Sequence, residues 1–412
     1  MSKGSSSGPR AFKRAFIRGT RFIKKHSSRF SLKSHPAPAR KKITEPIVAV
    51  DAMGGDYAPH EIIKGAVRAA REYGIKIQLV GPPDRISREL SKYNLKDLSI
   101  EIVAATDYIT MEDKQPATAV RRKQNSSIVV AMKQVATGQA DAVVSAGSTG
   151  AASAAALFCL KRIPGIERPG IAVVIPTAKG NMVLVDAGAN VDSSAAQMAQ
   201  HALMGSLFAS TALELESPRV GLLSIGEEPG KGNFSTKATF SVLDKMQSIN
   251  FVGNVEGRTL AEGYCDVLVA DGFVGNVFLK TLEGSIKMAF QMLHQELTKS
   301  IDLKMGAMIC KPAFRQLKHE RLNYARYGGA VLLGVQGVVI IAHGISNDYA
   351  IMNAIRVGAE TAQGGVIQKI KDSLKIDDIS ALSGIVSKVK DFVTGQDSLH
   401  TPPELEDEEQ LQ

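Results

Sequence analysis

The sequence predicts an α/β fold, in which a three-layer α/β/α doubly wound domain surrounds a mostly parallel sheet. From Ile47 onward, short apolar runs rich in β-branched residues alternate with helical stretches, and nearly every run ends in glycine or a small polar residue. The 412 residues are 44% hydrophobic, which is enough for a large core. The expected strands are Ile47–Val50, Ile75–Val80, Ile100–Val103, Ala142–Ser145, Ile171–Ile175, Met182–Val185, Val220–Ser224, Phe251–Gly253 and Val267–Ala270, while Ala151–Leu160 and Ala330–Ala342 suit core helix or strand.

The loop Asp51–Pro59 follows the first expected strand. Gly54 and Gly55 allow the backbone to turn and to approach a ligand closely, and Asp56 can cap the helix expected over Glu61–Arg71. Ligands of open α/β sheets bind at the carboxyl ends of strands, where free N–H groups favour an anion such as phosphate. An ordinary strand-to-helix turn accounts for the same residues.

Three further strand ends repeat this chemistry with glycines, hydroxyls, acids and amides. They contribute Ser145, Gly147, Ser148, Thr149 and Gly150; Asp186 and Asn190; and Asp271, Gly272 and Asn276. If the sheet is parallel, these residues and Asp51 lie along one edge and together line a cleft of hydrogen-bond donors that suits an oxyanion. For each Asp, a helix cap or a turn is the alternative.

Two partial motifs are rejected. The segment 226–233 is one residue short of a P-loop and has no Ser or Thr after its lysine, and the segment 147–150 lacks the third glycine of a dinucleotide fingerprint. Histidines and cysteines are scattered, without HExxH or CxxC; they include His60, His201, His294, His343, Cys159, Cys265 and Cys310. We expect no metal, no cofactor and no disulfide framework, and cysteine usage favours a reducing compartment.

Positive charge is concentrated in the first 46 residues. They hold thirteen basic residues and one acid, a balance of +12, which leaves −3 for the rest of the net charge of +9. Helical spacing in Phe12–Lys25 predicts a basic amphipathic helix, which would suit an anionic membrane surface or an organelle transit peptide; a disordered, solvated arm is the alternative. The chain has no Trp and its body no basic stripe, so no nucleic-acid partner is expected. Residues 47–375 are the expected α/β domain, and 376–412 a C-terminal helix and acidic tail.

The segment Leu282–Glu320 predicts a protruding amphipathic helical hairpin. We expect its stems to pack in a dimer bundle and its tip, around Met305–Ile309, to lie on lipid. No apolar run reaches the length that crosses a bilayer. The expected localisation is cytoplasmic, with peripheral membrane association.

Five segments, in order between Ile47 and Leu374, give the chain a resemblance to the phosphate acyltransferase (PlsX) family of bacterial phospholipid synthesis. They are Val50–Asp56, Ala119–Ser127, Asp186–Asp192, Asp271–Asn276 and Tyr327–Ala330. Ser148 departs from the family pattern, in which many members have Asn. The resemblance implies a homodimeric enzyme that needs no cofactor and moves a fatty acyl group from acyl carrier protein to inorganic phosphate. It also implies that a membrane glycerol-3-phosphate acyltransferase uses the acyl phosphate.

The resemblance suggests roles for particular residues. Lys231 would offset charge or protonate the leaving sulfur, and Asn276 would donate to the oxyanion. The backbone amides of the glycine loops would position phosphate, with the side chains of Ser145, Ser148 and Thr149; Asn125 belongs to the same expected site. The basic triplet Arg121, Arg122 and Lys123 would dock the acidic carrier protein. A mobile surface lysine and a solvated helix face are the alternatives for Lys231 and the triplet.

Two other functions remain open from the sequence. A short-chain phosphotransacylase that uses coenzyme A would need the same architecture and phosphate site. A non-catalytic membrane-associated scaffold would instead use the basic arm and the helical hairpin.

Overall fold

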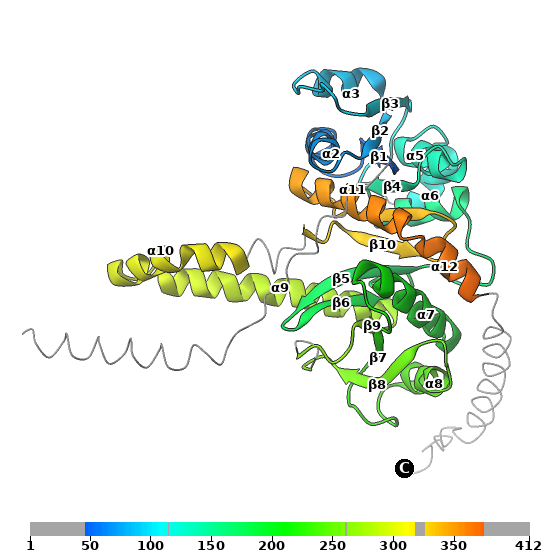
Figure 1. Cartoon of the computed structure of the whole chain (residues 1–412), viewed down its shortest axis with the longest axis vertical. Helices are drawn as coiled ribbons and strands as arrows, with labels where there is room; N and C mark the ends of the chain where they lie inside the picture. Colours follow the sequence, from blue (N-terminus) through cyan, green and yellow to red (C-terminus); the bar gives the residue numbers. More distant parts are fainter. Residues whose placement is uncertain (1–45, 114, 260–261, 318–325, 375–412) are drawn as a thin grey trace, which may run out of the picture. The chain divides into compact units, whose positions relative to one another are not determined.

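The computed structural model describes residues 46–113, 115–259, 262–317 and 326–374. The predictions for the arm 1–45 and for the tail 376–412 lie outside the described residues. One eleven-stranded sheet runs in the order β3-β2-β1-β4-β11-β10-β5-β6-β9-β7-β8 (Figure 1). Its strands are β1 (Ile47–Asp51), β2 (Lys76–Gly81), β3 (Ile100–Ala104), β4 (Ala142–Ser145), β5 (Gly170–Thr177), β6 (Gly180–Val185), β7 (Arg219–Ser224), β8 (Asn250–Glu256), β9 (Val267–Val269), β10 (Ala330–Leu333) and β11 (Val338–Ile341).

Helices cover both faces of the sheet. The helices of the described residues are α2 (His60–Tyr73), α3 (Pro83–Leu90), α4 (Pro116–Arg122), α5 (Ser127–Ala136), α6 (Thr149–Cys159), α7 (Ala195–Ala212), α8 (Phe234–Leu243), α9 (Gly272–Leu297), α10 (Ile301–Gln316), α11 (Asp348–Gln363) and α12 (Val366–Ser373). Among them, α10 packs on α9 and does not cover the sheet (Figure 1). Val48 and Val50 of β1 belong to a core with α2, α7, α8, α11 and α12, whereas Ala49 belongs to a second core with α4, α5 and α6. Successive side chains of a strand point to opposite faces, so the predicted three layers are confirmed.

Most predicted strands are found within one or two residues of their expected ends, and Ala142–Ser145 matches β4. The ambiguous run Ala330–Ala342 forms two antiparallel strands, β10 and β11. Among the strands that the structure describes, only β10 with its two neighbours and β5 with β6 pair antiparallel, so the sheet is mostly parallel, as predicted.

The prediction that all the polar strand ends share one edge is wrong. Strands β1, β4, β11 and β5 run in one direction, whereas β6, β9 and β7 run in the other. The reversal arises because the turn between Thr177 and Gly180 brings β6 back antiparallel to β5. The carboxyl ends of β1 and β4 therefore lie at the edge of the sheet opposite to those of β6, β7 and β9.

Helices α9 and α10 follow each other after a connection of residues 298–300 and pack side by side (Figure 1). Met305–Ile309 was predicted to form a tip, but this is wrong because these residues lie within α10. None of the α10 residues that the structure describes is buried, and Met308 and Ile309 are exposed. In the described part of the chain, no helix combines the length and apolar character that a membrane span requires.

Candidate active site

The predicted site residues form two clusters. The first cluster lies at the carboxyl ends of β1 and β4 and includes Asp51, Gly54, Gly55, Asp56, Asn125, Ser145, Gly147, Ser148, Thr149 and Gly150. The second cluster lies at the carboxyl ends of β6, β7 and β9 and includes Asp186, Asn190, Lys231, Asp271, Gly272 and Asn276. Four inter-strand steps separate β4 from β6, so the two clusters are offset by about 19 Å across the sheet, in addition to lying at its opposite edges.

Asp51 is the centre of the first cluster and is only 3% exposed. Ser145 Oγ donates to Asp51 Oδ2 (2.7 Å), and the backbone N–H of Met53 donates to Asp51 Oδ1 (3.3 Å). Burial raises the pKa of Asp51 above its ordinary value, although hydrogen bonds from Ser127 and Ser145 act in the opposite direction. The hydroxyls at this strand end thus bind the protein's own carboxyl group.

Two helices begin beside Asp51. Ser126 is the N-cap residue of α5, and Ser148 is the N-cap residue of α6. Gly147 N donates to Ser145 Oγ (3.1 Å), which fixes the turn into α6. Asp56 does not cap α2, because Pro59 occupies the N-cap position. The backbone N–H of Asp56 instead donates to Gly344 O (2.9 Å). The first cluster is therefore a closely hydrogen-bonded turn region with two helix N-termini.

Asp186 is the corresponding acid of the second cluster and is fully buried. Its Oδ1 accepts from the backbone N–H groups of Ile171 (2.9 Å), Gly188 (3.1 Å) and Ala189 (2.9 Å). Its Oδ2 accepts from Asn190 N (2.9 Å) and Asn190 Nδ2 (2.8 Å). Five N–H donors thus hold one carboxylate, and the loop after β6 is fixed around it.

Asp271 fixes the start of α9. Its Oδ1 accepts from Phe273 N (2.9 Å), and its Oδ2 accepts from Ser193 N (2.6 Å). The helix passes so close to the loop after β6 that a Cβ on Gly272 would lie 2.0 Å from Asn190 O, and one on Gly275 would lie 2.0 Å from Asp186 O. Glycine is therefore required at both positions, and α9 is locked against Asp186.

Of the two predicted catalytic residues, Asn276 lies on α9, the helix that this frame positions. Asn276 is exposed in the first turns of α9, and a Cβ on Gly188 would lie 3.3 Å from Asn276 Cβ. Lys231 is exposed on the loop between β7 and α8, where its backbone N–H donates to Glu228 O (3.0 Å). The structure thus brings an exposed cation and an exposed amide to the same edge of the sheet.

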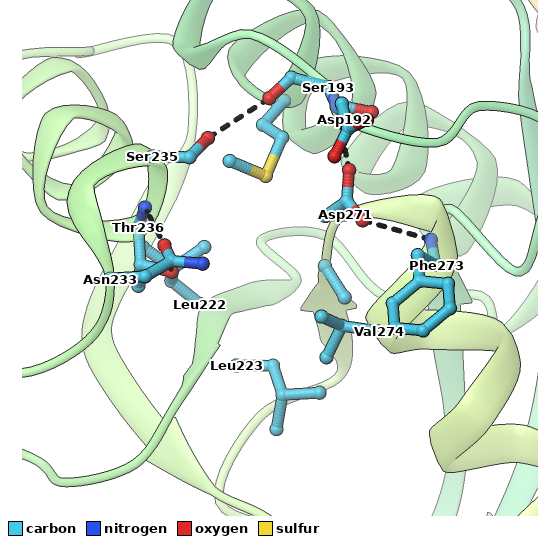
Figure 2. Close-up of a pocket in the computed structure, with 12 residues that line it drawn as sticks. Asp192, Ser193, Leu222, Leu223, Asn233, Ser235, Thr236, Asp271, Phe273 and Val274 are labelled. Carbon is cyan, nitrogen blue, oxygen red and sulfur yellow. Dashed lines mark hydrogen bonds between the residues drawn. The ribbon is translucent and has the colours of Figure 1, made fainter.

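A pocket of about 280 Å³ opens beside these residues (Figure 2). It lies between the N-termini of α8 and α9 and the end of β7, and it is lined by Asp192, Ser193, Met198, Leu222, Leu223, Asn233, Ser235, Thr236, Ala270, Asp271, Phe273 and Val274. Asn233 Oδ1 accepts from Thr236 N (2.8 Å) and caps α8. Sequence reasoning missed Ser193, Ser235 and Thr236, although the rejected P-loop-like segment ends at Asn233 and marks the start of α8.

His201 is buried next to the second cluster and is not a catalytic candidate. Its Nε2 lies 3.3 Å from Arg168 O, and its Nδ1 has no partner among the described residues. Burial lowers the pKa of His201, against the opposing effect of Asp186. It is therefore a neutral core histidine at physiological pH.

The basic triplet lies at the end of α4, which packs on α6 next to the first cluster. Lys123 Nζ donates to Tyr108 O (2.9 Å) and pairs with Asp107 (3.7 Å) and Asp113 (3.8 Å). Arg121 and Arg122 are exposed. The two arginines are thus the members of the triplet that a partner can reach, because Lys123 is engaged within the chain.

Chemically, the second cluster combines what an oxyanion reaction needs. Two helix N-termini border one pocket, and an exposed amide and an exposed lysine lie at the same edge of the sheet; each of these groups can stabilise negative charge.

Known proteins give independent information about the chain. A family model described as a fatty acid synthesis protein matches residues 47–369. A phosphate acyltransferase from Desulfitobacterium hafniense (strain Y51) is 49% identical over 328 residues, which cover 79% of this chain and 97% of the relative. The phosphate acyltransferase from Desulforamulus reducens (strain MI-1) is 52% identical over 330 residues, which cover 80% and 98%.

Among solved structures, a phosphotransacetylase from Streptococcus pyogenes superimposes with a TM-score of 0.53 at 17% identity, over 79% of this chain and 96% of that one. This similarity concerns the fold alone. The family match and the sequence identity over nearly the full length of the relatives are decisive, and the chain therefore belongs to the fatty acid synthesis protein family of the phosphate acyltransferases.

Proposed function

We propose that this acyltransferase moves a long-chain acyl group from acyl carrier protein to inorganic phosphate and so forms an acyl phosphate. The relatives named phosphate acyltransferase support transfer to phosphate. The observation that carries the proposal is the second cluster, in which two helix N-termini border one pocket and Lys231 and Asn276 each stand two residues from a residue that lines it.

In the proposed reaction, a phosphate oxygen attacks the thioester carbonyl carbon. The carbonyl π electrons move to oxygen, and Asn276 Nδ2 donates to the oxyanion that forms. The intermediate then collapses, the C–S bond breaks, and the thiolate leaves with the electron pair. Lys231 Nζ offsets the charge or gives a proton to the sulfur. The frame around Asp186 keeps α9, and with it Asn276, at a fixed place, so little reorganisation accompanies the reaction.

The donor approaches, in this proposal, over the first cluster. Arg121 and Arg122 are exposed on α4 and would attract an acidic carrier protein. A long flexible prosthetic arm is needed to carry the thioester from there to the second cluster, which is offset by about 19 Å across the sheet and lies at its opposite edge. We assign the strand ends at Asp51 and Ser145 to binding of that arm.

The helices α9 and α10 are proposed to act outside the chemistry. Helix α9 runs without interruption from the site at Asn276 to Leu297, and α10 exposes Met305, Met308 and Ile309. We propose that these helices pair with a second copy in a homodimer and touch an anionic membrane surface. There the acyl phosphate would pass to a membrane glycerol-3-phosphate acyltransferase.

The direct test is an assay of acyl-phosphate formation with purified protein, inorganic phosphate and a long-chain acyl thioester. The carrier-bound donor is expected to react with a kcat/KM at least about tenfold above that of the same chain on coenzyme A, since only the carrier offers an acidic protein surface that can dock on Arg121 and Arg122. Absence of acyl phosphate from both donors would rule out the proposed function.

A phosphotransacylase that uses coenzyme A is the second candidate. The shared fold with a protein titled phosphotransacetylase favours it. A clear preference for short-chain acyl-coenzyme A in the same assay would establish this alternative.

A further inference from the structure

The pocket beside α8 contains a polar side chain whose role the structure leaves unexplained. Ser193 lines the pocket and is only 3% exposed, and its hydroxyl is buried without a hydrogen-bond partner among the described residues. A buried hydroxyl without a partner is costly to the folded state. Such a group at a pocket wall indicates a ligand that completes its hydrogen bonding.

The backbone of Ser193 is fixed on both sides. Ser193 N donates to Asp271 Oδ2 (2.6 Å), and Ser193 O accepts from Ser235 Oγ (3.0 Å), as Figure 2 shows. These two bonds connect the loop before α7 to the starts of α9 and α8. The hydroxyl is therefore presented by a rigid support, which lowers the cost of binding.

Helix α8 adds donors to the same pocket. Asn233 Oδ1 already accepts from Thr236 N, so the cap leaves the N–H groups of Phe234 and Ser235 without a partner within the helix. Lys231 stands two residues before Asn233 and brings positive charge. Of the two carboxylates that line the pocket, Asp192 is exposed, and Asp271 accepts one N–H bond on each oxygen. A small anion is thus favoured on the side of α8.

We propose that inorganic phosphate, the acceptor of the reaction proposed above, on which this inference rests, binds here. Ser193 Oγ donates to one phosphate oxygen, and the N–H groups of Phe234 and Ser235 donate to others. The first cluster is the rival location, but there Ser145 and Ser127 donate to Asp51. This assignment places the acceptor at the same edge of the sheet as Lys231 and Asn276.

The first cluster supplies a matched control. Ser126 is also fully buried, also lacks a hydroxyl partner among the described residues, and also precedes a helix, α5. Ser193→Ala and Ser126→Ala therefore remove equivalent hydroxyls, one from each cluster. Ser241→Ala, on the exposed side of α8, controls for a change in that helix.

The test is isothermal titration calorimetry of the full chain with inorganic phosphate and no acyl donor. We expect Ser193→Ala to bind phosphate about tenfold more weakly than the wild type, because a hydrogen bond to a charged group is lost. Ser126→Ala and Ser241→Ala should bind as the wild type does. In the acyl-transfer assay, Ser193→Ala should raise the KM for phosphate and leave the KM for the donor unchanged.

Wild-type affinity in Ser193→Ala, weakened binding in Ser126→Ala, or no saturable binding by the wild type would overturn the assignment. Ser235→Ala, which loses the bond to Ser193 O, provides a second variant and is also expected to weaken binding. Phosphate binding with the expected pattern, but without acyl-phosphate formation, would leave this inference standing and reject the proposed function.

Discussion

The two clusters look alike in sequence but differ in how each uses its buried acid. Asp51 accepts from a serine hydroxyl at 2.7 Å, and burial raises its pKa. Asp186 accepts from four backbone N–H groups and one amide group and anchors the loop beside α9. A strand followed by an acid and a glycine therefore predicts a polar strand end. The hydrogen-bond donors around the acid decide whether that strand end binds substrate or fixes the loop that positions catalytic residues.

The largest effect on activity is expected for Lys231→Ala. If the second cluster performs the chemistry, kcat should fall by about 100-fold or more through loss of the cation beside the developing charge. Lys237→Ala removes an exposed lysine from α8 and should leave kcat unchanged. Steady-state kinetics at saturating donor and phosphate measure both. Wild-type turnover of a folded Lys231→Ala protein would remove this residue from the mechanism.

The acids themselves give the next contrast, in stability. Asp186→Asn turns an NH2 group toward N–H donors and should lower the free energy of unfolding by about 2–4 kcal/mol. Asp51→Asn should cost less than about 1 kcal/mol, because serine hydroxyls can rotate to accept from the new amide. Urea unfolding of both variants would test this. Equal losses in the free energy of unfolding would mean that the two acids stabilise their clusters to the same extent.

The pH dependence should separate the clusters by sign. Burial beside the second cluster lowers the pKa of His201 and keeps its side chain neutral in the folded state. Its contribution to the free energy of unfolding is therefore full above the ordinary pKa of about 6.5 and is lost as pH falls below that value. The loss should be about 1 kcal/mol between pH 7.5 and 5.5. His201→Gln should flatten this slope, as measured by urea unfolding at both pH values.

Asp51 should act in the opposite direction, because burial raises its pKa in the folded state. Its contribution to the free energy of unfolding is full below the pKa that Asp51 has in the unfolded chain and is lost as pH rises through the folded-state pKa. An unchanged acid slope in His201→Gln would show that other groups cause the acid loss.

A further contrast concerns docking near the first cluster. Replacing both Arg121 and Arg122 by Glu should raise the KM for carrier-bound donor by about tenfold at low salt and weaken its salt dependence. Turnover with a coenzyme A donor serves as the internal control and should change little. Kinetics that are unchanged across ionic strength would argue against docking on α4.

Much of the fold was predictable because β-branched apolar runs identify buried strands, as Ala142–Ser145 shows. The reversal at β6 was also within reach of the sequence. Only six residues separate the runs Ile171–Ile175 and Met182–Val185, whereas a parallel crossover needs a dozen or more. The pocket was not predictable, because Ser193 and Ser235 come from different segments that only the tertiary structure brings together.

Single-turnover formation of acyl phosphate, at saturating donor and phosphate, is the decisive measurement for acyl transfer at the second cluster. Asn276→Ala and Ser148→Ala each remove one polar side chain, the first from the second cluster and the second from the first cluster. We expect Asn276→Ala to slow the transfer step by about 100-fold, whereas Ser148→Ala should stay within about threefold of the wild type. A slow step in Ser148→Ala, together with normal transfer in Asn276→Ala, would contradict transfer at the second cluster.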